Sequence, residues 1–306
     1  MSPAPVNFIN SYWRQKFGQR IQRVCLDVGL TCPNRDGTKG VGGCTFCRND
    51  SFGAANHMRG LSISGQLEAG IEKVKKRYKA KSFLAYFQSY TNTYASLDTL
   101  KKFYLEALAH PDVIGLAIGT RPDCLADELL DFLQELSYQK EIYLELGIES
   151  LNEQTLIDIN RGHTVKDFLT SLDRCHKRNL KVGAHLIIGL PGDNQNDWQK
   201  WGAILASLPL HSIKFHNLLV LKETIMGSQY KKSPFKVLGE QEYMKILAEI
   251  LEHLPAHLYI DRLLAEAPSE FLIMPEKTSS SSEFKNRLLT YMTENEMFQG
   301  KRAANI

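Results

Sequence analysis

Three cysteines near the start of the chain have the residue type and the spacing of a metal site. Cys32, Cys44 and Cys47 lie within sixteen residues, in a loop that also contains four glycines. Thiolates are soft ligands that suit zinc or iron–sulfur clusters. Three thiolates on a [4Fe–4S] cluster leave one iron open, and an open metal position can bind a substrate. The stretch therefore favours a metal centre, with glycines that let the backbone wrap around a bulky cluster.

A zinc site is the alternative interpretation of the same cysteines. Structural zinc normally has a fourth Cys or His ligand nearby. Cys25 and His57 are candidates, although Cys25 falls inside a predicted strand and is better explained as a buried apolar residue. The remaining Cys124 and Cys175 are scattered along the chain. In a reducing compartment, this clustering argues for a metal rather than for a disulfide framework.

The elements that must position this loop alternate along the chain. The predicted strands are short and apolar throughout, as is typical of strands buried on both faces. They are Ile21–Val28, Phe83–Gln88, Val113–Gly119, Ile142–Gly147, Lys181–Gly189 and Ser212–Leu219. The segments between them have helical spacing. Repeated strand–helix units predict a parallel sheet curved into a partial barrel, with functional residues at the carboxyl ends of the strands.

The pattern loosens after Leu221. A helix, a strand, a serine-rich loop and a last amphipathic helix are predicted in turn over Glu240–Leu254, His257–Leu263, Thr278–Ser282 and Glu283–Thr293. No clear linker separates them from the preceding units. We therefore expect a core barrel with an N-terminal extension over residues 1–222, and a small C-terminal accessory segment over residues 223–306 that packs on the barrel.

Composition and charge set limits on location and partners. Of the 306 residues, 43% are hydrophobic and 23% charged, which is ordinary for a globular protein. No apolar run is long enough to cross a membrane, and the first twenty residues lack the apolar stretch of a signal peptide. We expect a cytoplasmic protein with no membrane contact. The basic run Lys73–Lys81 is a solvated helix face or a phosphate-binding patch, and the solvated face is favoured.

Further motifs follow the other predicted strands. They are Thr120-Arg121-Pro122-Asp123, Glu145-Leu146-Gly147-Ile148-Glu149-Ser150, Asn160-Arg161-Gly162-His163 and, after His185, Gly189-Leu190-Pro191-Gly192. With the loop that begins Cys32-Pro33-Asn34-Arg35, they resemble the radical S-adenosylmethionine (SAM) superfamily, in its short bacterial branch related to the Elongator catalytic subunit. The resemblance implies an α/β fold with a partial (β/α)6 TIM-like barrel.

The resemblance also implies the cofactors. A [4Fe–4S] cluster would sit on Cys32, Cys44 and Cys47, with SAM on the open iron. One electron from the cluster would cleave SAM to methionine and a 5′-deoxyadenosyl radical, which abstracts hydrogen from the substrate. A reductant protein such as flavodoxin or ferredoxin would supply the electron.

The residues that would contact SAM follow from the same resemblance. They are Gln88, Glu149, Ser150, Arg161, His185, Gly189, Leu190 and Pro191. Gln88 begins a polar run where many members carry Gly-Gly-Glu, so Gln88 or backbone carbonyls would bind the SAM amino group. The guanidinium of Arg161 suits a carboxylate. His185 is either an adenosine contact or a hydrogen-bonded core histidine, and the loop at 189–192 is otherwise a plain strand-to-helix turn.

Polar residues late in the barrel are the candidates for substrate contact. They are Lys214, His216 and Asn217 on the sixth strand, and Lys222 just after it. Alternation would put Lys214 and His216 on one face and Asn217 on the other. Lys214 is otherwise an ion-pair partner near the barrel rim. Asp123 either orients Arg121 or caps a helix, and the cap is favoured.

The resemblance implies tRNA as substrate and partner, with conversion of a carboxymethylaminomethyl group on carbon 5 of the wobble uridine towards aminomethyl. Two alternatives remain open: a radical SAM enzyme acting on a small metabolite or a protein side chain, and a non-catalytic, zinc-stabilised RNA-binding protein. Asp261-Arg262-Leu263 stands where related sequences tend to have His-Arg-Leu. This departure bears on substrate details more than on radical formation.

Overall fold

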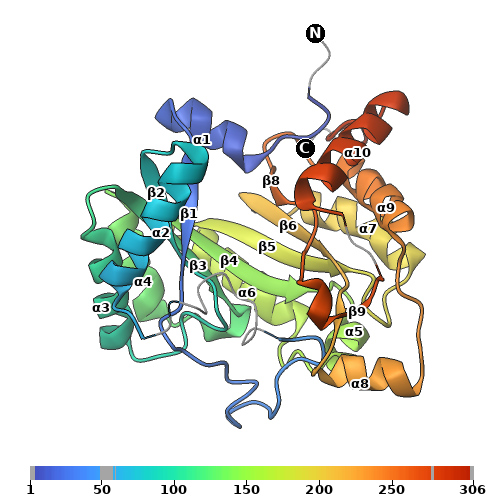
Figure 1. The fold of residues 1–306 in the computed structure, drawn as a ribbon, viewed down its shortest axis with the longest axis horizontal. Coiled ribbons are helices and arrows are strands. Elements are labelled where there is room, and N and C mark those ends of the chain that lie inside the picture. The colour runs from blue at the N-terminus through green and yellow to red at the C-terminus, as the bar shows by residue number, and fades with distance from the viewer. Residues whose placement is uncertain (1–3, 49–57, 59, 277–278, 304–306) are drawn as a thin grey trace.

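A curved parallel sheet forms the centre of the molecule. The computed structural model describes residues 4–48, 58, 60–276 and 279–303. Seven strands pair in the order β1-β2-β3-β4-β5-β6-β8, and each pair is parallel. They are β1 (Ile21–Leu26), β2 (Ser82–Phe87), β3 (Val113–Thr120), β4 (Glu141–Glu149), β5 (Lys181–Ile188), β6 (Ser212–Asn217) and β8 (Tyr259–Arg262). The strands fan across the molecule from β1 to β8 (Figure 1). The predicted partial barrel is confirmed.

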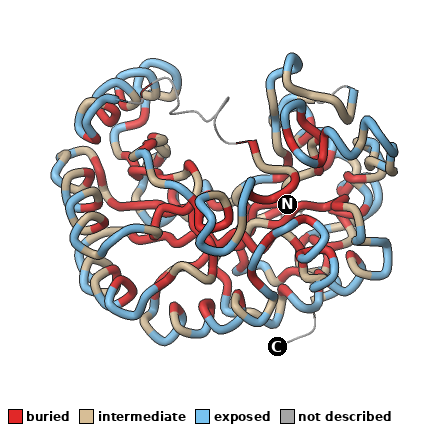
Figure 2. Tube along the Cα trace, turned by 90° about the horizontal axis from the view of Figure 1, so that it is seen from below, coloured by how far each residue is buried: buried red, intermediate tan, exposed pale blue. Residues whose placement is uncertain are grey.

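Helices follow the strands and cover the outer face of the sheet. They are α2 (Ile63–Tyr78), α3 (Leu97–Leu108), α4 (Asp127–Ser137), α5 (Glu153–Asp158), α6 (Val165–His176) and α7 (Gln195–Ala206). Asn152 and Thr164 cap α5 and α6, because each side chain accepts a hydrogen bond from the first turn of its helix. Figure 2 shows the buried strands within an arc of helices whose outer surfaces are exposed.

The core lies between the sheet and these helices, and it explains why the strands are apolar throughout. Leu116, Leu144 and Leu186 on three neighbouring strands are fully buried, as is Phe168 from α6. The opposite, concave side of the sheet carries polar as well as apolar residues, among them Glu145. One side of each strand therefore builds the core, while the other side lines the interior of the barrel.

The C-terminal segment adds to the same sheet. After β6 the chain forms β7 (Val220–Leu221), α8 (Ile225–Lys232), α9 (Glu240–His253), η3 (Ser269–Phe271), β9 (Leu272–Met274) and α10 (Ser281–Glu294). β8 pairs with β6, α9 contacts α7, and β7 pairs with β9 in a separate antiparallel ribbon. The division at residue 222 stays a prediction. The predicted loop at 278–282 is wrong in its second half, because Ser280 caps α10 in a capping box and Ser281 begins the helix.

The N-terminal segment covers the free edge of β8. α1 (Ile9–Phe17) contacts β8, and before it Phe8 bridges to Ile260, whose amide donates to the Asn7 carbonyl at 2.8 Å. The Gln299 amide in turn donates to the Pro5 carbonyl at 2.8 Å. Both described ends of the chain thus meet at this edge. Within the described residues, no helix combines the length and the apolar character needed to cross a membrane.

Candidate functional site

The cysteine loop is held against the carboxyl ends of the strands by its own backbone. The Cys47 amide donates to the Cys44 carbonyl at 3.0 Å, and the Thr45 amide donates to the Ile159 carbonyl, after α5, at 2.9 Å. Gly42 and Gly43 have φ of 85° and 83°, which side chains with a Cβ rarely adopt. The glycines therefore allow the chain to turn back directly before Cys44.

All three cysteines line one cavity, which we call the cysteine cavity. Its volume is about 310 Å³, within the range of small-ligand sites. Among the predicted SAM contacts, it is also lined by Gln88, Glu149, Arg161 and His185. In the described part of the chain, no three His, Cys, Asp or Glu side chains are arranged to hold a metal ion. The sequence-predicted cysteines and four polar residues are thus brought together at the ends of β1, β2, β4 and β5.

The surroundings of the thiols suit sulfur ligands that carry negative charge. Arg161 Nη1 lies 3.4 Å from Cys44 Sγ, and Asn34 Nδ2 lies 3.7 Å from the same sulfur. Burial, together with the neighbouring Cys44 thiol, raises the pKa of Cys47 to about 12. Three thiolates in this space therefore need a cation to offset their charge. The donor set of three thiols, with hydrogen-bond donors behind one of them, fits an iron–sulfur cluster.

Arg161 is fixed by the end of β4. Its Nη2 donates to the Gly147 carbonyl at 2.5 Å and lies 3.2 Å from Glu149 Oε1. Glu149 has φ of 71° at an irregularity in the pairing of β4 with β5. A Cβ at Gly147 would lie 2.5 Å from Glu149 Oε1 and 2.7 Å from Arg161 Nη2, so a larger residue there would displace both side chains. The motif after Glu145 therefore shapes the contact between Arg161 and Cys44.

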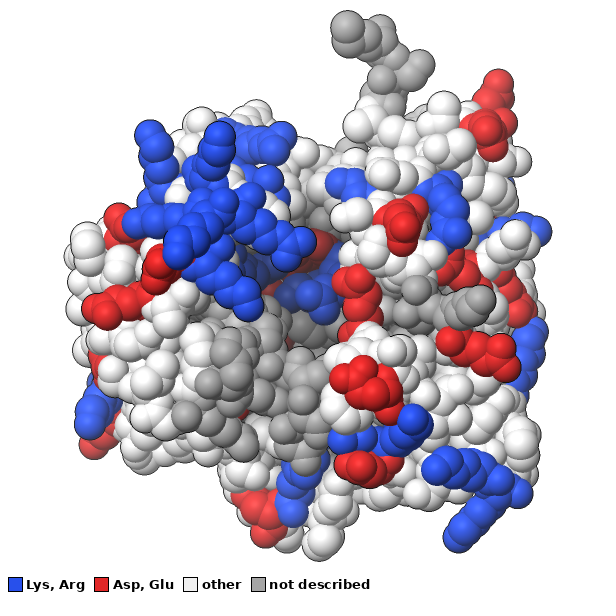
Figure 3. Space-filling view, in the orientation of Figure 1, with Lys and Arg blue, Asp and Glu red and all other residues white. Residues whose placement is uncertain are grey.

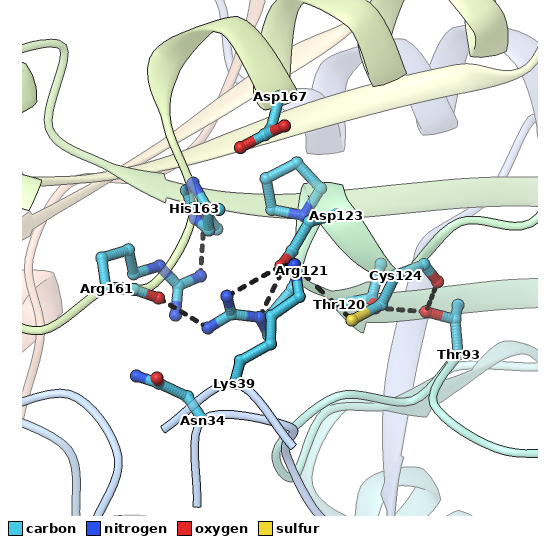
Figure 4. Close-up of polar contacts among 12 residues, drawn as sticks. Asn34, Lys39, Thr93, Thr120, Arg121, Asp123, Cys124, Arg161, His163 and Asp167 are labelled. Atoms are coloured by element: carbon cyan, nitrogen blue, oxygen red, sulfur yellow. Dashed lines mark hydrogen bonds and ion pairs between the residues drawn. The ribbon is translucent and has the colours of Figure 1, made fainter. Parts of the chain in front are cut away.

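A second buried arginine fixes Arg161 from behind (Figure 4). Arg121 Nη1 donates to the Arg161 carbonyl at 2.7 Å, and its Nε and Nη2 donate to the two Asp123 carboxylate oxygens at 2.9 and 3.0 Å. Lys39, from the cysteine loop, contacts the same carboxylate at 2.5 Å. His163 stays neutral, because burial and the charges of Arg161 and Arg121 lower its pKa to about 3.

The favoured role of Asp123 as a helix cap is therefore wrong. α4 has Ala126 at its N-cap position, and η2 (Pro122–Cys124) has Arg121 there without a side-chain cap. Burial alone would raise the pKa of Asp123, but hydrogen bonding and charge from Arg121 and Lys39 lower it to about 2. The bidentate ion pair outweighs capping because the guanidinium is buried and would otherwise lack an acceptor.

A network of four charged side chains crosses the interior of the barrel. Glu145 on β4 accepts from Lys214 on β6 at 2.5 Å and lies 3.1 Å from Arg23 on β1. Arg23 also pairs with both carboxylate oxygens of Asp261 on β8, at 2.6 and 2.7 Å. Burial alone would raise the pKa of Glu145, but Lys214 and Arg23 hold it well below its usual value. The network joins the two edge strands across the open side of the barrel.

A second cavity, the Lys214 cavity, adjoins this network. Its volume is about 630 Å³. Its polar lining includes Arg23, Gln88, Lys214, His216, Asp261 and Arg262. Gln88, His216 and Arg262 line the cysteine cavity as well, so the two spaces share a wall. Lys214 is thus both an ion-pair partner and a lining residue, and Lys214 and His216 face the interior together, as alternation predicts.

The remaining predicted residues fall into two groups. His185 lines the cysteine cavity, and its Nε2 donates to the Glu145 carboxylate at 3.1 Å, so it is both a cavity residue and a hydrogen-bonded interior histidine. Asn217 lines that cavity too, and its side-chain Oδ1 accepts a hydrogen bond from the Ala265 amide. Lys222 lies apart from both cavities and donates to the Glu270 carbonyl. Its assignment as a substrate contact stays a prediction.

The loop after β5 lies behind the cavity wall. Gly189 has φ of 100°, Leu190 is buried, and neither lines the cysteine cavity or the Lys214 cavity, whereas Ile187 lines the cysteine cavity. Pro191 is likewise absent from both linings. Ser150 is fully buried and donates to Asp193 Oδ1 at 2.8 Å. Their roles as SAM contacts stay predictions.

Asp193 makes this loop sensitive to pH. Burial raises its pKa to about 6, and only Oδ1 accepts hydrogen bonds, from Ser150 and Thr155. The folded protein thus binds this proton more tightly than the unfolded chain, and stability falls as pH rises from about 4 through about 6. We expect Asp193→Asn to raise the free energy of unfolding by about 2 kcal/mol at pH 8 and to change it little at pH 4. Urea unfolding at both pH values tests this, and an unchanged pH dependence would contradict it.

Within the described residues, neither candidate for the fourth ligand of a zinc site lies with the three clustered cysteines. Cys25 lies on β1 and lines the Lys214 cavity, whereas the three clustered cysteines line the other one. His57 lies outside the described residues. Sequence reasoning missed Arg23, Tyr86 and Arg262 as residues that line the cavities. The available signal was a charged residue within an otherwise apolar parallel strand, as in Ile21–Leu26.

Comparison with known proteins gives a consistent result. The family model of the radical SAM superfamily matches residues 32–201, and that of the Radical_SAM C-terminal domain matches residues 210–294. YtqA of Bacillus subtilis (strain 168) is 32% identical over 293 residues, which cover 96% of this chain and 91% of that protein. A tRNA uridine(34) acetyltransferase of Methanocaldococcus jannaschii is 24% identical, over 62% of this chain and 35% of its own length.

The fold is also similar to a solved structure. The archaeal Methanocaldococcus infernus Elp3 with an N-terminal deletion superposes with a TM-score of 0.72 at 18% identity. The match covers 91% of this chain and 64% of that one. The likeness confirms the curved parallel sheet with its flanking helices as the fold.

Proposed function

The chain belongs to the radical SAM superfamily, whose members use a [4Fe–4S] cluster and SAM, and we propose that Cys32, Cys44 and Cys47 bind that cluster here. The observation that carries the proposal is the cysteine cavity, which the three thiols share with Arg161 and Glu149. When bound, the cluster supplies the electron that cleaves SAM, and SAM supplies the radical that abstracts hydrogen. The cavity volume and its polar lining fit a ligand next to the thiols.

The chain's own residues have distinct tasks in this proposal. Asn34 and Arg161 donate to the Cys44 sulfur and so stabilise it as a thiolate. Glu149 orients Arg161 and remains near enough to the cavity to meet polar groups of SAM. Gln88 serves the SAM amino group, and His185, held by Glu145, serves the adenosine. Ser150 and the loop at 189–191 would then support the site from behind.

We further propose that the substrate is the side chain at carbon 5 of the wobble uridine in tRNA. The reaction would take place in the cytoplasm, and a flavodoxin or ferredoxin would supply the electron. The similarity to a tRNA uridine(34) acetyltransferase and to Elp3 supports this proposal. Lys214, His216 and Asn217 would face the substrate from β6.

A basic face beside the cavities supports a nucleic acid as partner. Six of its exposed residues, which define the basic face, are Arg14, Lys16, Arg20, Lys73, Lys76 and Arg77. Figure 3 shows blue side chains gathered over α1 and α2 next to the hollow of the molecule. Arg20 and Arg77 both stack on Tyr78, and Arg20 also lines the Lys214 cavity. Phosphates along this face would bring a nucleotide to the cavity mouth.

Anaerobic reconstitution tests the proposed function. The protein would be loaded with iron and sulfide, reduced in the presence of SAM, and assayed for 5′-deoxyadenosine with and without tRNA that lacks the mature modification. We expect 5′-deoxyadenosine in both reactions, and a changed wobble nucleoside by mass spectrometry only with tRNA. Formation of 5′-deoxyadenosine with unchanged tRNA would overturn the substrate and favour a small metabolite or a protein side chain. Binding of zinc alone, with intact SAM, would overturn the radical chemistry.

The basic face gives a separate prediction. Replacing Lys73, Lys76 and Arg77 together with glutamine should weaken tRNA binding at least about tenfold at physiological salt, because phosphate binding by these side chains releases counterions. The slope of log affinity against log salt should become shallower by about one for every phosphate that the variant no longer neutralises. Filter binding across a salt series measures both quantities.

The matched control changes the same charge elsewhere. Lys166, Lys177 and Lys200 are exposed on α6, at its C-cap and on α7, away from α1 and α2. Their combined replacement with glutamine should leave tRNA affinity and its salt slope unchanged. Equal losses in the two triple variants would show that net charge alone governs binding, and would remove the basic face from the proposal.

A further inference from the structure

The pairing of β6 with β8 contains a shift that turns two successive charged residues to the same side. Ile213 pairs with Ile260, but Lys214 pairs with Arg262, so Asp261 is the extra residue. Side chains along a regular strand alternate between faces, whereas a bulge re-aims one of them. As a result Asp261 and Arg262 both line the Lys214 cavity. The bulge places one more charge in the interior than a regular strand would.

The four charges of the interior network cancel one another. Arg23 and Lys214 are cationic, and Glu145 and Asp261 accept from them within 3.5 Å. Arg262, at the end of β8, is exposed, and its side chain makes no hydrogen bond or ion pair with any of the described residues. A guanidinium offers five N–H donors in a planar fork and accepts none. Arg262 therefore presents a positive charge without an ion-pair partner to the space that the two cavities share.

His216 adds a second unsatisfied group on that wall. It lines both cavities, and within the described structure its Nε2 is shielded from solvent without a hydrogen-bond partner. Its ring stacks on His185 with 5.8 Å between the centroids, which holds it in place. Arg262 and His216 thus line the same space from neighbouring strands.

We propose that Arg262, assisted by His216, binds a carboxylate of the substrate at the wall between the two cavities. The planar fork of the guanidinium matches the two oxygens of a carboxylate. The basic face takes the phosphates outside, so the interior site is left for an acidic group on the reacting side chain itself. The inference rests on the proposed function, since it names the group that the substrate would carry into the site. SAM also has a carboxylate, and the test separates the two sources.

The first experiment needs no turnover. Reconstituted holoprotein would be treated with phenylglyoxal, which modifies free guanidinium groups, and labelling of Arg262 would be followed by peptide mass spectrometry. We expect N-methylglycine to slow the labelling of Arg262 at least about tenfold and its uncharged amide to have no effect. Arg174, which pairs with Asp127 on the outer helices, is the matched arginine and should label equally in all samples. Equal protection by acid and amide, or no protection, would overturn the site.

The second experiment assigns the source of the carboxylate. Anticodon stem-loops carrying carboxymethylaminomethyl or methylaminomethyl on the wobble uridine would compete for binding to holoprotein with SAM present. We expect the wild type and Arg262→Lys to bind the stem-loop with the acidic group more tightly than the other. In Arg262→Gln this preference should fall at least about tenfold, while SAM affinity stays unchanged. A preference kept by Arg262→Gln, with weakened SAM binding, would assign Arg262 to SAM and overturn the proposal.

The two experiments separate the site from the function it rests on. Protection of Arg262 in a protein that leaves every tRNA unchanged would uphold a carboxylate site and overturn tRNA as substrate. If tRNA is modified but Arg262 is neither protected nor needed for a preference for the acidic group, the carboxylate site would be overturned and the proposed function would stand.

Discussion

Replacing Cys32, Cys44 or Cys47 singly with alanine is expected to reduce 5′-deoxyadenosine formation by more than about 100-fold. Removing a residue that only hydrogen-bonds to a metal ligand typically lowers metal affinity or activity by about 10- to 100-fold. Removing a ligand itself should lower activity further. Each variant should also lose iron and the visible absorption of the cluster. All three cysteines line the same cavity, so the three variants should lose iron and product formation to a similar extent. The measurement is anaerobic reconstitution, followed by iron content and product formation.

Two other cysteines provide the controls. Cys124 carries a half-buried thiol 3.9 Å from Asp123 Oδ1, and Cys175 is fully buried in the core. Cys124→Ala and Cys175→Ala should retain full iron content and product formation. Cys175→Ala should cost about 1 kcal/mol of stability, because it leaves a small cavity. Normal SAM cleavage in any of the three cavity variants, or its loss in both controls, would contradict the assignment of the cluster.

Glu145→Gln is expected to lower the free energy of unfolding by about 3–5 kcal/mol, as breaking a buried ion pair from one side does. The glutamine would leave Lys214 with Asp261 at 3.5 Å as its nearest carboxylate, and would remove the partner of His185. Urea unfolding at pH 7 measures the loss. Glu72→Gln breaks an exposed pair with Lys76 and should leave the unfolding midpoint unchanged.

The same carboxylate should contribute to acid unfolding. Because the pKa of Glu145 is lowered in the folded protein, its stabilisation is present above the unfolded value near 4.5 and is lost as pH falls below it. The difference in stability between the wild type and Glu145→Gln should therefore shrink as pH is lowered from 5 towards 3. A constant difference across this range would show that the pKa of Glu145 is the same in the folded and the unfolded protein.

Most of the sheet was predictable because parallel strands are buried on both faces and have apolar sequences. All six predicted barrel strands begin within one residue of the observed β1 to β6. The C-terminal segment was less predictable, since β8 spans only Tyr259–Arg262 and pairs with β6 from outside the repeating pattern. A short strand at an edge leaves little periodicity to read.

The site was predictable where motifs follow strands and unpredictable where partners come from distant strands. Cysteine spacing led directly to the cavity. Nothing local indicated that Arg23 would pair with Asp261, because 238 residues separate them. The bulge that turns Arg262 inward depends on register between strands, which the sequence of one strand does not contain. Asp123 was misjudged because the burial of Arg121, only two residues away, and the approach of Lys39 both depend on the tertiary fold.

The pairing of the N-terminal segment with β8 has a consequence for how the chain is made. Residues 5–8 leave the ribosome long before their partners Ile260 and Gln299. Until β8 is made, the nascent sheet ends at β6 with open hydrogen-bonding groups. An uncovered edge can pair with another chain. Slow translation of the segment between β6 and β8 should therefore favour sheet-to-sheet association between neighbouring nascent chains.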